Sequence, residues 1–187
     1  MSPLLRSMNR ASTGVPDTVT DVGRDEAIGA LFRAHCADLV RLGYALTGDR
    51  GAAEEAAQDA FISLHRNWGS LRDHSASRAY LRAAVVNRCR SVHRQRARTV
   101  RVVQPLRPDL VELPGADIDA LAHEASQRIA SQVRTLPTRQ REVIVCRYYL
   151  DLTERQTAEL LQVSVGSVKK HASRALAALH VGLEVAP

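Results

Sequence analysis

Cations and hydroxyls gather on one side of a predicted helix near the C-terminus. At about 100° per residue, one arc of this helix is apolar and holds Val165, Val168, Ala172, Ala175, Leu176 and Leu179. The opposite arc and its flanks hold Ser167, Lys169, Lys170, His171, Ser173 and Arg174. No carboxylate lies between Gly166 and Leu183 to repel phosphate. This helix therefore has the layout of a DNA recognition helix, although a short amphipathic helix in any basic protein can look similar.

Capping residues indicate where this helix and the preceding helix begin. Ser164 is placed to cap the N-terminus of the recognition helix. Thr153 and Gln156 have the spacing of a capping box for the preceding helix. A tight turn separates the two segments, so the sequence predicts a helix-turn-helix.

A second basic segment lies in the first half of the chain. From His74 to Pro108 there is no Asp or Glu, although exposed charged faces normally mix both signs. The arginines of this segment are Arg78, Arg82, Arg88, Arg90, Arg94, Arg96, Arg98, Arg101 and Arg107. A cationic surface of this density favours nucleic acid as a partner, with strongly salt-dependent binding. The alternative is a solvated charged face.

The helix predicted just before this segment carries the opposite charge. Its polar face presents Glu54, Glu55, Gln58 and Asp59, and its other face is apolar. DNA would repel these carboxylates, so we expect them to contact a basic protein partner. A solvated acidic face that offsets the helix dipole is the alternative.

Helical periodicity dominates the chain and predicts an all-α fold. We expect two small helical domains joined by a flexible linker, the C-terminal one a helix-turn-helix, with essentially no sheet. Residues 1–24 lack apolar periodicity and are expected to be a disordered leader. The first domain is predicted over 25–98, with helices broken at Thr47–Gly51 and around Gly69–Ser75. The linker spans 99–120 and is rich in proline, and the second domain spans 121–182.

Composition narrows the partners and excludes several classes of protein. The chain has 187 residues, a formal net charge of +6 and an isoelectric point of about 9.8, which favours polyanionic partners. No apolar run reaches the roughly 20 residues of a spanning helix, and no signal peptide is evident, so a cytoplasmic protein is expected without membrane contact.

The cysteines give little reason to expect a disulfide or a metal. Three cysteines without a CxxC pair indicate reduced core residues. The spacing of Cys89 and His93, and the adjacency of His35 and Cys36, leave a metal site as the rival interpretation. No cofactor or catalytic motif is apparent, so we do not expect an enzyme.

Several stretches together resemble the extracytoplasmic-function sigma factors, small members of the bacterial sigma-70 family. The RYYL and YALTG stretches are most similar to the sequences of the actinobacterial SigE-like branch. The resemblance covers about residues 28 to 180, and its main segments are FRAHCADLVRLGYALTG (Phe32–Gly48), AAEEAAQDAFISLHRNW (Ala52–Trp68), AYLRAAVVNRCR (Ala79–Arg90), LPTRQREV (Leu136–Val143), RYYL (Arg147–Leu150) and SVGSVK (Ser164–Lys169).

The resemblance implies roles for the charged segments. Core RNA polymerase, through the clamp helices of its largest subunit, would contact Glu54, Glu55, Gln58 and Asp59. The -10 element of promoter DNA would meet Trp68, Arg78, Tyr80, Arg82, Asn87 and Arg88, with a flipped base held by the loop from Trp68 to Ser75. The -35 element would meet the cationic face of the recognition helix. An anti-sigma factor is a possible further partner.

The chain departs from the family pattern at three places. Gln162 stands where the turn of the helix-turn-helix usually has Gly. Ala56 and Ala57 replace a usual Leu-Val pair, which is expected to thin the packing of the docking helix. Tyr80 stands where Trp is common.

Two other functions fit parts of the pattern. A dimeric helix-turn-helix regulator would bind duplex DNA without replacing sigma, but it needs a ligand or dimerisation domain where this chain has an acidic helix followed by arginines. A helical adaptor that binds only proteins would not need the basic C-terminal helix. The interpretation as a sigma factor, a promoter-specificity subunit of RNA polymerase, accounts for the acidic helix, the arginine-rich segment and the basic C-terminal helix.

Overall fold

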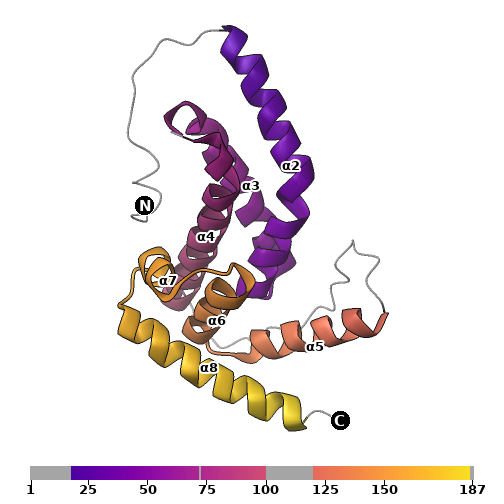
Figure 1. Cartoon of the computed structure of the whole chain (residues 1–187), viewed down its shortest axis with the longest axis vertical. Helices are drawn as coiled ribbons and strands as arrows, with labels where there is room; N and C mark the ends of the chain where they lie inside the picture. The colour runs from indigo at the N-terminus through magenta and orange to yellow at the C-terminus, as the bar shows by residue number, and fades with distance from the viewer. Residues whose placement is uncertain (1–17, 72, 100–119, 186–187) are drawn as a thin grey trace. The chain divides into compact units, whose positions relative to one another are not determined.

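The computed structural model describes residues 18–71, 73–99 and 120–185, and every element in these ranges is a helix or a helical turn (Figure 1). The all-α prediction is confirmed for them. The chain divides into two units, residues 1–109 and 110–187, which we describe separately. Most of the predicted leader and nearly all of the predicted linker lie outside the described residues.

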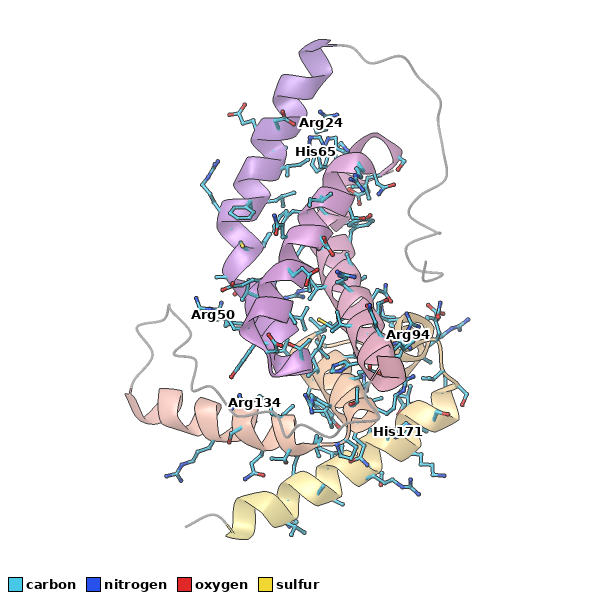
Figure 2. The ribbon with its side chains drawn as sticks, turned by 180° about the vertical axis from the view of Figure 1, so that it is seen from behind. Arg24, Arg50, His65, Arg94, Arg134 and His171 are labelled. Atoms are coloured by element: carbon cyan, nitrogen blue, oxygen red, sulfur yellow. The ribbon has the colours of Figure 1, made fainter. Side chains whose placement is uncertain are left out.

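The described residues of the first unit form three long helices and two short turns. They are α2 (Thr18–Thr47), α3 (Arg50–Arg66), η1 (Trp68–Ser70), η2 (His74–Ala76) and α4 (Ser77–Thr99). Helix α2 begins at Thr18, earlier than the predicted Asp25, so residues 18–24 of the expected leader are helical. Asp25 Oδ1 lies 3.1 Å from His65 Nε2 of α3. Figure 2 shows His65 close to Arg24 in the early part of α2.

The predicted break at Thr47–Gly51 is confirmed. Gly48 adopts a φ of 71°, a left-handed conformation that ends α2. Asp49 then caps α3 by accepting a hydrogen bond from the Ala52 amide at 3.0 Å. The chain therefore turns back sharply, which lays α3 against α2.

Small residues bring α2 and α3 close together. A Cβ atom added to Gly43 would lie 2.9 Å from the Cα of Ala53, so the backbones approach too closely for a larger residue. Ala56 and Ala57 are buried at 0% and 1% exposure. These alanines, expected to thin the packing of the docking helix, belong to its buried face. The surrounding core holds Leu42, Leu46, Leu64, Leu81, Val85 and Val86.

The second unit contains the helix-turn-helix and two supporting helices. Its elements are α5 (Ala120–Thr135), α6 (Thr138–Ile144), the π-helical turn η3 (Val145–Tyr149), α7 (Glu154–Leu161) and α8 (Val165–Val185). Helices α5, α6 and α7 all contact α8. Leu136, Ile144 and Ala175 form a buried cluster against which Val133 and Leu179 pack.

Both predicted helix caps of the helix-turn-helix are present. Thr153 and Gln156 form a capping box at the start of α7. Ser164 Oγ accepts from the Ser167 amide at 3.1 Å at the start of α8. The local sequence therefore fixes where each helix begins.

The apolar arc predicted for α8 is only partly buried. Val168 and Ala175 are fully buried, but Leu176 and Val165 are 44% and 39% exposed. The predicted apolar arc is therefore wider than the strip of α8 that α5, α6 and α7 cover.

Gln162 occupies the strained position that the sequence indicated. Its φ of 51° and ψ of 49° are left-handed, and it ends α7 with its amide directed at the Ala158 and Glu159 carbonyls. Left-handed backbone costs a residue with a Cβ roughly 1 kcal/mol more than it costs Gly.

Gln162→Gly is accordingly expected to stabilise the second unit by up to about 1 kcal/mol, because Gly adopts this conformation without strain. Calorimetric unfolding of the full chain would measure the change. Gln162→Ala retains a Cβ and serves as the control, so an equal gain from Ala would contradict the strain explanation.

Candidate nucleic-acid interface

The outer face of α8 exposes cations and hydroxyls close together. Lys170, Ser173 and Arg174 are exposed. Lys170 and Arg174 are one helical turn apart, about 40° around the axis, so both extend from the same side. With no carboxylate on this stretch, the face attracts phosphate.

The other residues predicted for this face are partly engaged within the unit. Lys169 Nζ lies 3.6 Å from Glu154 Oε2 of α7. The Ser167 hydroxyl lies 2.9 Å from that of Ser164 in the helix cap. His171 is half-buried, and its Nδ1 has no hydrogen-bond partner within the described residues. These three side chains flank the exposed set.

A stacked pair of rings lies in the loop between α3 and α4. The rings of Trp68 and His74 have centroids 4.2 Å apart and planes inclined by 22°. Asp73 fixes the loop beside them, since its carboxylate accepts from the amide and the hydroxyl of Ser75 at 2.8 and 2.7 Å. These bonds hold the pKa of Asp73 below its usual value. His74 lies in the loop that was predicted to hold a flipped base but was not singled out there, although a His within reach of the chain's single Trp was a signal for it.

Tyr80 was predicted to contact DNA, and its surroundings differ from those expected of a residue that faces DNA. Its side chain is buried at 4% exposure. Its hydroxyl lies 2.8 Å from Ser63 Oγ and accepts from Asn67 Nδ2 at 3.3 Å. Because these partners belong to α3 and the residue after it, Tyr80 ties α4 to α3 instead of facing solvent.

The remaining residues predicted on α4 do not share one face. Arg78 is exposed, whereas Arg82 and Asn87 are half-buried. Arg82 and Asn87 lie about 140° apart around the helix. Asn87 Nδ2 is buried and has no hydrogen-bond partner in the described part of the chain. Helix α4 thus offers separate basic and amide contacts.

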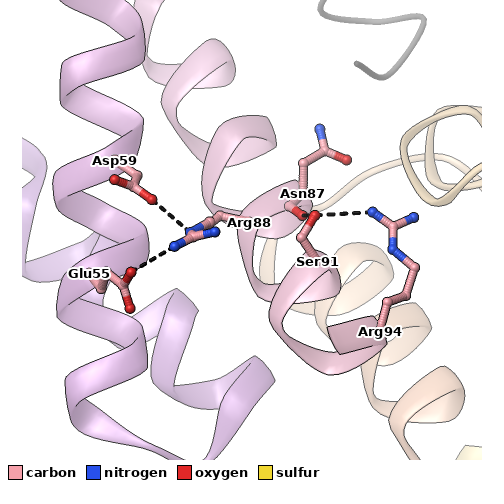
Figure 3. A network of polar contacts seen from close by, with 6 residues as sticks. All are labelled: Glu55, Asp59, Asn87, Arg88, Ser91 and Arg94. Atoms are coloured by element: carbon pink, nitrogen blue, oxygen red, sulfur yellow. Dashed lines mark hydrogen bonds and ion pairs between the residues drawn. The ribbon is translucent and has the colours of Figure 1, made fainter. Parts of the chain in front are cut away.

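Arg88 pairs with the acidic face of α3 (Figure 3). Its Nη2 lies 2.6 Å from Glu55 Oε1, and its Nε lies 2.6 Å from Asp59 Oδ2. The residue expected to meet DNA therefore contacts two of the residues expected to meet polymerase. On the same face Glu54 pairs with Arg50 at 2.8 Å, and Gln58 is exposed.

The rival metal interpretation finds no support in the described residues. They contain no group of three or more His, Cys, Asp or Glu that could hold an ion. Cys89 Sγ faces the Gly43 carbonyl at 4.0 Å, and His93 Nε2 lies 3.1 Å from the Leu46 carbonyl, so both pack against α2. Burial, with a smaller effect from Glu54, raises the pKa of Cys36. None of the described helices is long and apolar enough to cross a membrane.

Comparison with known protein families gives two matches, one in each unit. Residues 31–99 match sigma-70 region 2, and residues 126–179 match sigma-70 region 4. The chain is 33% identical over 153 residues to the ECF RNA polymerase sigma factor SigM of Mycobacterium tuberculosis, covering 82% of this chain and 75% of the relative. The chain belongs to the extracytoplasmic-function sigma factors.

Other similarities agree with this family. The RNA polymerase sigma-E factor of Streptomyces avermitilis is 29% identical over 148 residues, covering 78% of this chain and 79% of the relative. Among solved structures, the sigma factor RpoE of Bartonella quintana in complex with the anti-sigma factor NepR has a TM-score of 0.62 at 20% identity, covering 85% of this chain and 98% of that one. CnrH in complex with the cytosolic domain of CnrY has a TM-score of 0.57 at 22% identity, covering 89% and 94%. These structures share the fold.

Membership of this family gives the overall function of the chain. It is a non-enzymatic subunit that binds core RNA polymerase and recognises promoter DNA. The dimeric regulator and the protein-only adaptor are thereby set aside, because neither carries both sigma regions.

Proposed function

We propose that the two units of this sigma factor divide promoter recognition between three surfaces. The docking face, which is Glu54, Glu55, Gln58 and Asp59 on α3, binds the clamp helices of core polymerase. Helix α4 and the loop before it take up the -10 element. The outer face of α8 binds the -35 element. The observation that carries this division is the separation of charge. Helix α3 exposes carboxylates, whereas α8 exposes cations and has no carboxylate between Gly166 and Leu183.

The -35 contact is proposed to centre on Lys170, Ser173 and Arg174. A recognition helix enters the major groove, where Arg can donate two hydrogen bonds to guanine and Lys can neutralise a phosphate. Ser167, Lys169 and His171 flank this centre and are proposed to reach the backbone. The ion pair between Lys169 and Glu154 is exposed and 3.6 Å long, so it opposes such a contact only weakly.

The -10 contact is proposed to use Trp68, Arg78, Arg82 and Asn87. Unpaired bases need stacking surfaces and hydrogen-bond partners to replace those lost on melting. Trp68 supplies a ring, Asn87 an amide whose Nδ2 lacks a partner among the described residues, and the arginines supply charge. Tyr80 serves this surface indirectly, by fixing α4 against α3.

Because promoter recognition is divided between two DNA surfaces, we expect DNA binding to depend on polymerase. Each DNA surface is small, and linking two modest contacts through a common partner raises their effective concentration. Addition of the purified chain to core polymerase should therefore give transcripts with defined 5′ ends, whose mapping would reveal the promoter motif. Tight, specific binding to duplex DNA without polymerase would contradict the proposal.

A protein inhibitor is proposed as a further partner. RpoE, which shares this fold, was solved in complex with the anti-sigma factor NepR, and CnrH was solved in complex with the cytosolic domain of CnrY. We place the chain in the cytoplasm, where its polymerase and promoters lie. Co-purification of a stoichiometric partner that blocks transcription would support this, and transcription undiminished in the presence of every bound partner would count against it.

The Trp68–His74 stack gives a direct optical test of -10 binding. An unpaired base is expected to extend the stack on the exposed side of His74, so a single-stranded -10 oligonucleotide should change the fluorescence of Trp68, the only Trp in the chain. His74→Ala should weaken binding by about 1 to 3 kcal/mol, the worth of one stacked base.

Two variants control this prediction. His74→Phe keeps a planar ring and should retain most of the affinity. His65→Ala removes an exposed histidine of α3 outside the loop and should leave binding unchanged. Equal affinity of the His74→Ala variant and the wild-type chain would remove His74 from the site.

A further inference from the structure

Arg88 bridges two carboxylates of the docking face from the neighbouring helix. Its Nη2 donates a hydrogen bond to Glu55 Oε1 at 2.6 Å, and its Nε forms an ion pair with Asp59 Oδ2 at 2.6 Å. The two carboxylates are one helical turn apart on α3. The three side chains are 37%, 58% and 44% exposed. The cluster therefore lies at the surface, where an incoming partner can reach it.

The same cluster stands between the two binding surfaces of the first unit. Ser91 lies about 60° around α4 from Arg88, and Figure 3 shows that Asn87, Ser91 and Arg94 extend from α4 on the side away from Glu55 and Asp59. A change of side-chain rotamer would swing the guanidinium from the α3 carboxylates toward this side. Arg88 can thus serve either surface, but its Nε and Nη2 cannot serve both together.

We propose that Arg88 is exchanged between the two surfaces. In the free chain it binds Glu55 and Asp59. When cations of core polymerase take these carboxylates, Arg88 is released to a phosphate of the -10 strand. This inference rests on the proposed roles of α3 and α4, and it makes docking on polymerase a condition for full DNA binding.

Electrostatics favours an exchange of this kind. Ion pairs between exposed side chains are individually weak, so a partner can replace one pair with another at little cost. A polymerase cation replaces Arg88 on the carboxylates, and a phosphate replaces the carboxylates on Arg88, so every charge remains paired. Coupling between binding sites is reciprocal, so DNA should raise the affinity for polymerase by the same factor.

The first test measures binding of the full chain, without polymerase, to a labelled single-stranded oligonucleotide by fluorescence anisotropy. Glu55→Gln with Asp59→Asn frees Arg88 and should tighten binding by about fivefold. The salt dependence should steepen by about 0.7 in log–log slope, as one added phosphate contact predicts. Adding Arg88→Gln to this variant should abolish both gains.

A matched control separates exchange from general charge. Asp25→Asn with Glu26→Gln removes two carboxylates from the same unit, and Asp25 pairs with Arg24 and His65 instead of Arg88. This variant should gain clearly less affinity. An equal gain, or a gain that survives loss of Arg88, would overturn the proposal.

A second test uses Arg88→Gln alone and does not depend on the carboxylate variants. Because Arg88 is already occupied in the free chain, this change should weaken oligonucleotide binding of the free chain clearly less than it weakens binding by the complex with core polymerase, where the loss should be about fivefold. Equal weakening in both states would show a permanent DNA contact and overturn the exchange. If the wild-type chain with core polymerase fails to give promoter-specific transcripts, the proposed function fails instead.

Discussion

Changing Glu54 and Asp59 together to lysine is expected to weaken binding to core polymerase by about tenfold to hundredfold. Charge pairs across protein interfaces have coupling energies from about 1.5 kcal/mol upward, and reversal replaces attraction by repulsion. Both carboxylates are accessible, with 52% and 44% of their side chains exposed. Binding of labelled chain to purified core at several salt concentrations would measure the loss.

The reversal needs a control with the same change in net charge. Asp25→Lys with Glu26→Lys alters two acidic residues of α2 outside the docking face, and it should lower the affinity much less. Circular dichroism of both variants would show whether the helices remain. Undiminished polymerase binding by the α3 variant would indicate that Glu54 and Asp59 form only a solvated acidic face.

The sequence predicted elements whose signals are local. The capping box of α7, the Ser164 cap of α8 and the break at Gly48 each depend on residues within a few positions of one another, and all are present. Gln162 was singled out in the same way, as a residue other than Gly in the turn, and its backbone is left-handed. Local hydrogen bonding and backbone sterics decide such features, so the sequence carries them directly.

The surroundings of Tyr80 and Arg88 depend on contacts between distant parts of the chain. Tyr80 and Arg88 both lie on a helix whose arginines indicate a nucleic-acid surface, and nothing in their immediate neighbours separates them from the exposed set. Tyr80 is buried because Ser63 and the Asn67 amide offer partners to its hydroxyl. Arg88 faces the α3 carboxylates, which are far away in sequence. Tertiary contacts decide which side of α4 packs on α3, and helical periodicity does not indicate that side.

The alanines of α3 show the same limit for packing. A comparison with the family pattern treats Ala56 and Ala57 as losses of apolar volume. The structure places them on the buried face of α3, in the same contact where Gly43 would carry its Cβ within 2.9 Å of the backbone at Ala53. Small residues on both helices permit this approach, and only the pair of helices together shows it.

Replacing Arg174 by alanine is expected to weaken recognition of the -35 element by about 1 to 3 kcal/mol and to relax specificity at one base pair, if its guanidinium reads a base edge. Lys170, one turn away on the same face, should behave differently. As a phosphate contact, its replacement by alanine should weaken binding evenly across sequences and reduce the salt slope by about 0.9. Transcription by the holoenzyme from promoters with single -35 substitutions, at several salt concentrations, would separate the two patterns.

Arg155 provides the comparison for both variants, because it is 87% exposed on α7 and pairs with Glu159 at 3.6 Å. Arg155→Ala removes the same charge from the helix-turn-helix but not from the outer face of α8, so it should leave specificity intact and change the salt slope less than Lys170→Ala does. If Arg174→Ala left promoter selectivity unchanged while it flattened the salt dependence, Arg174 would be a phosphate contact. Base reading by α8 would then have to come from Ser173 and the residues at the start of the helix. In the described part of α8, Arg174 is the only lysine or arginine that follows Lys170.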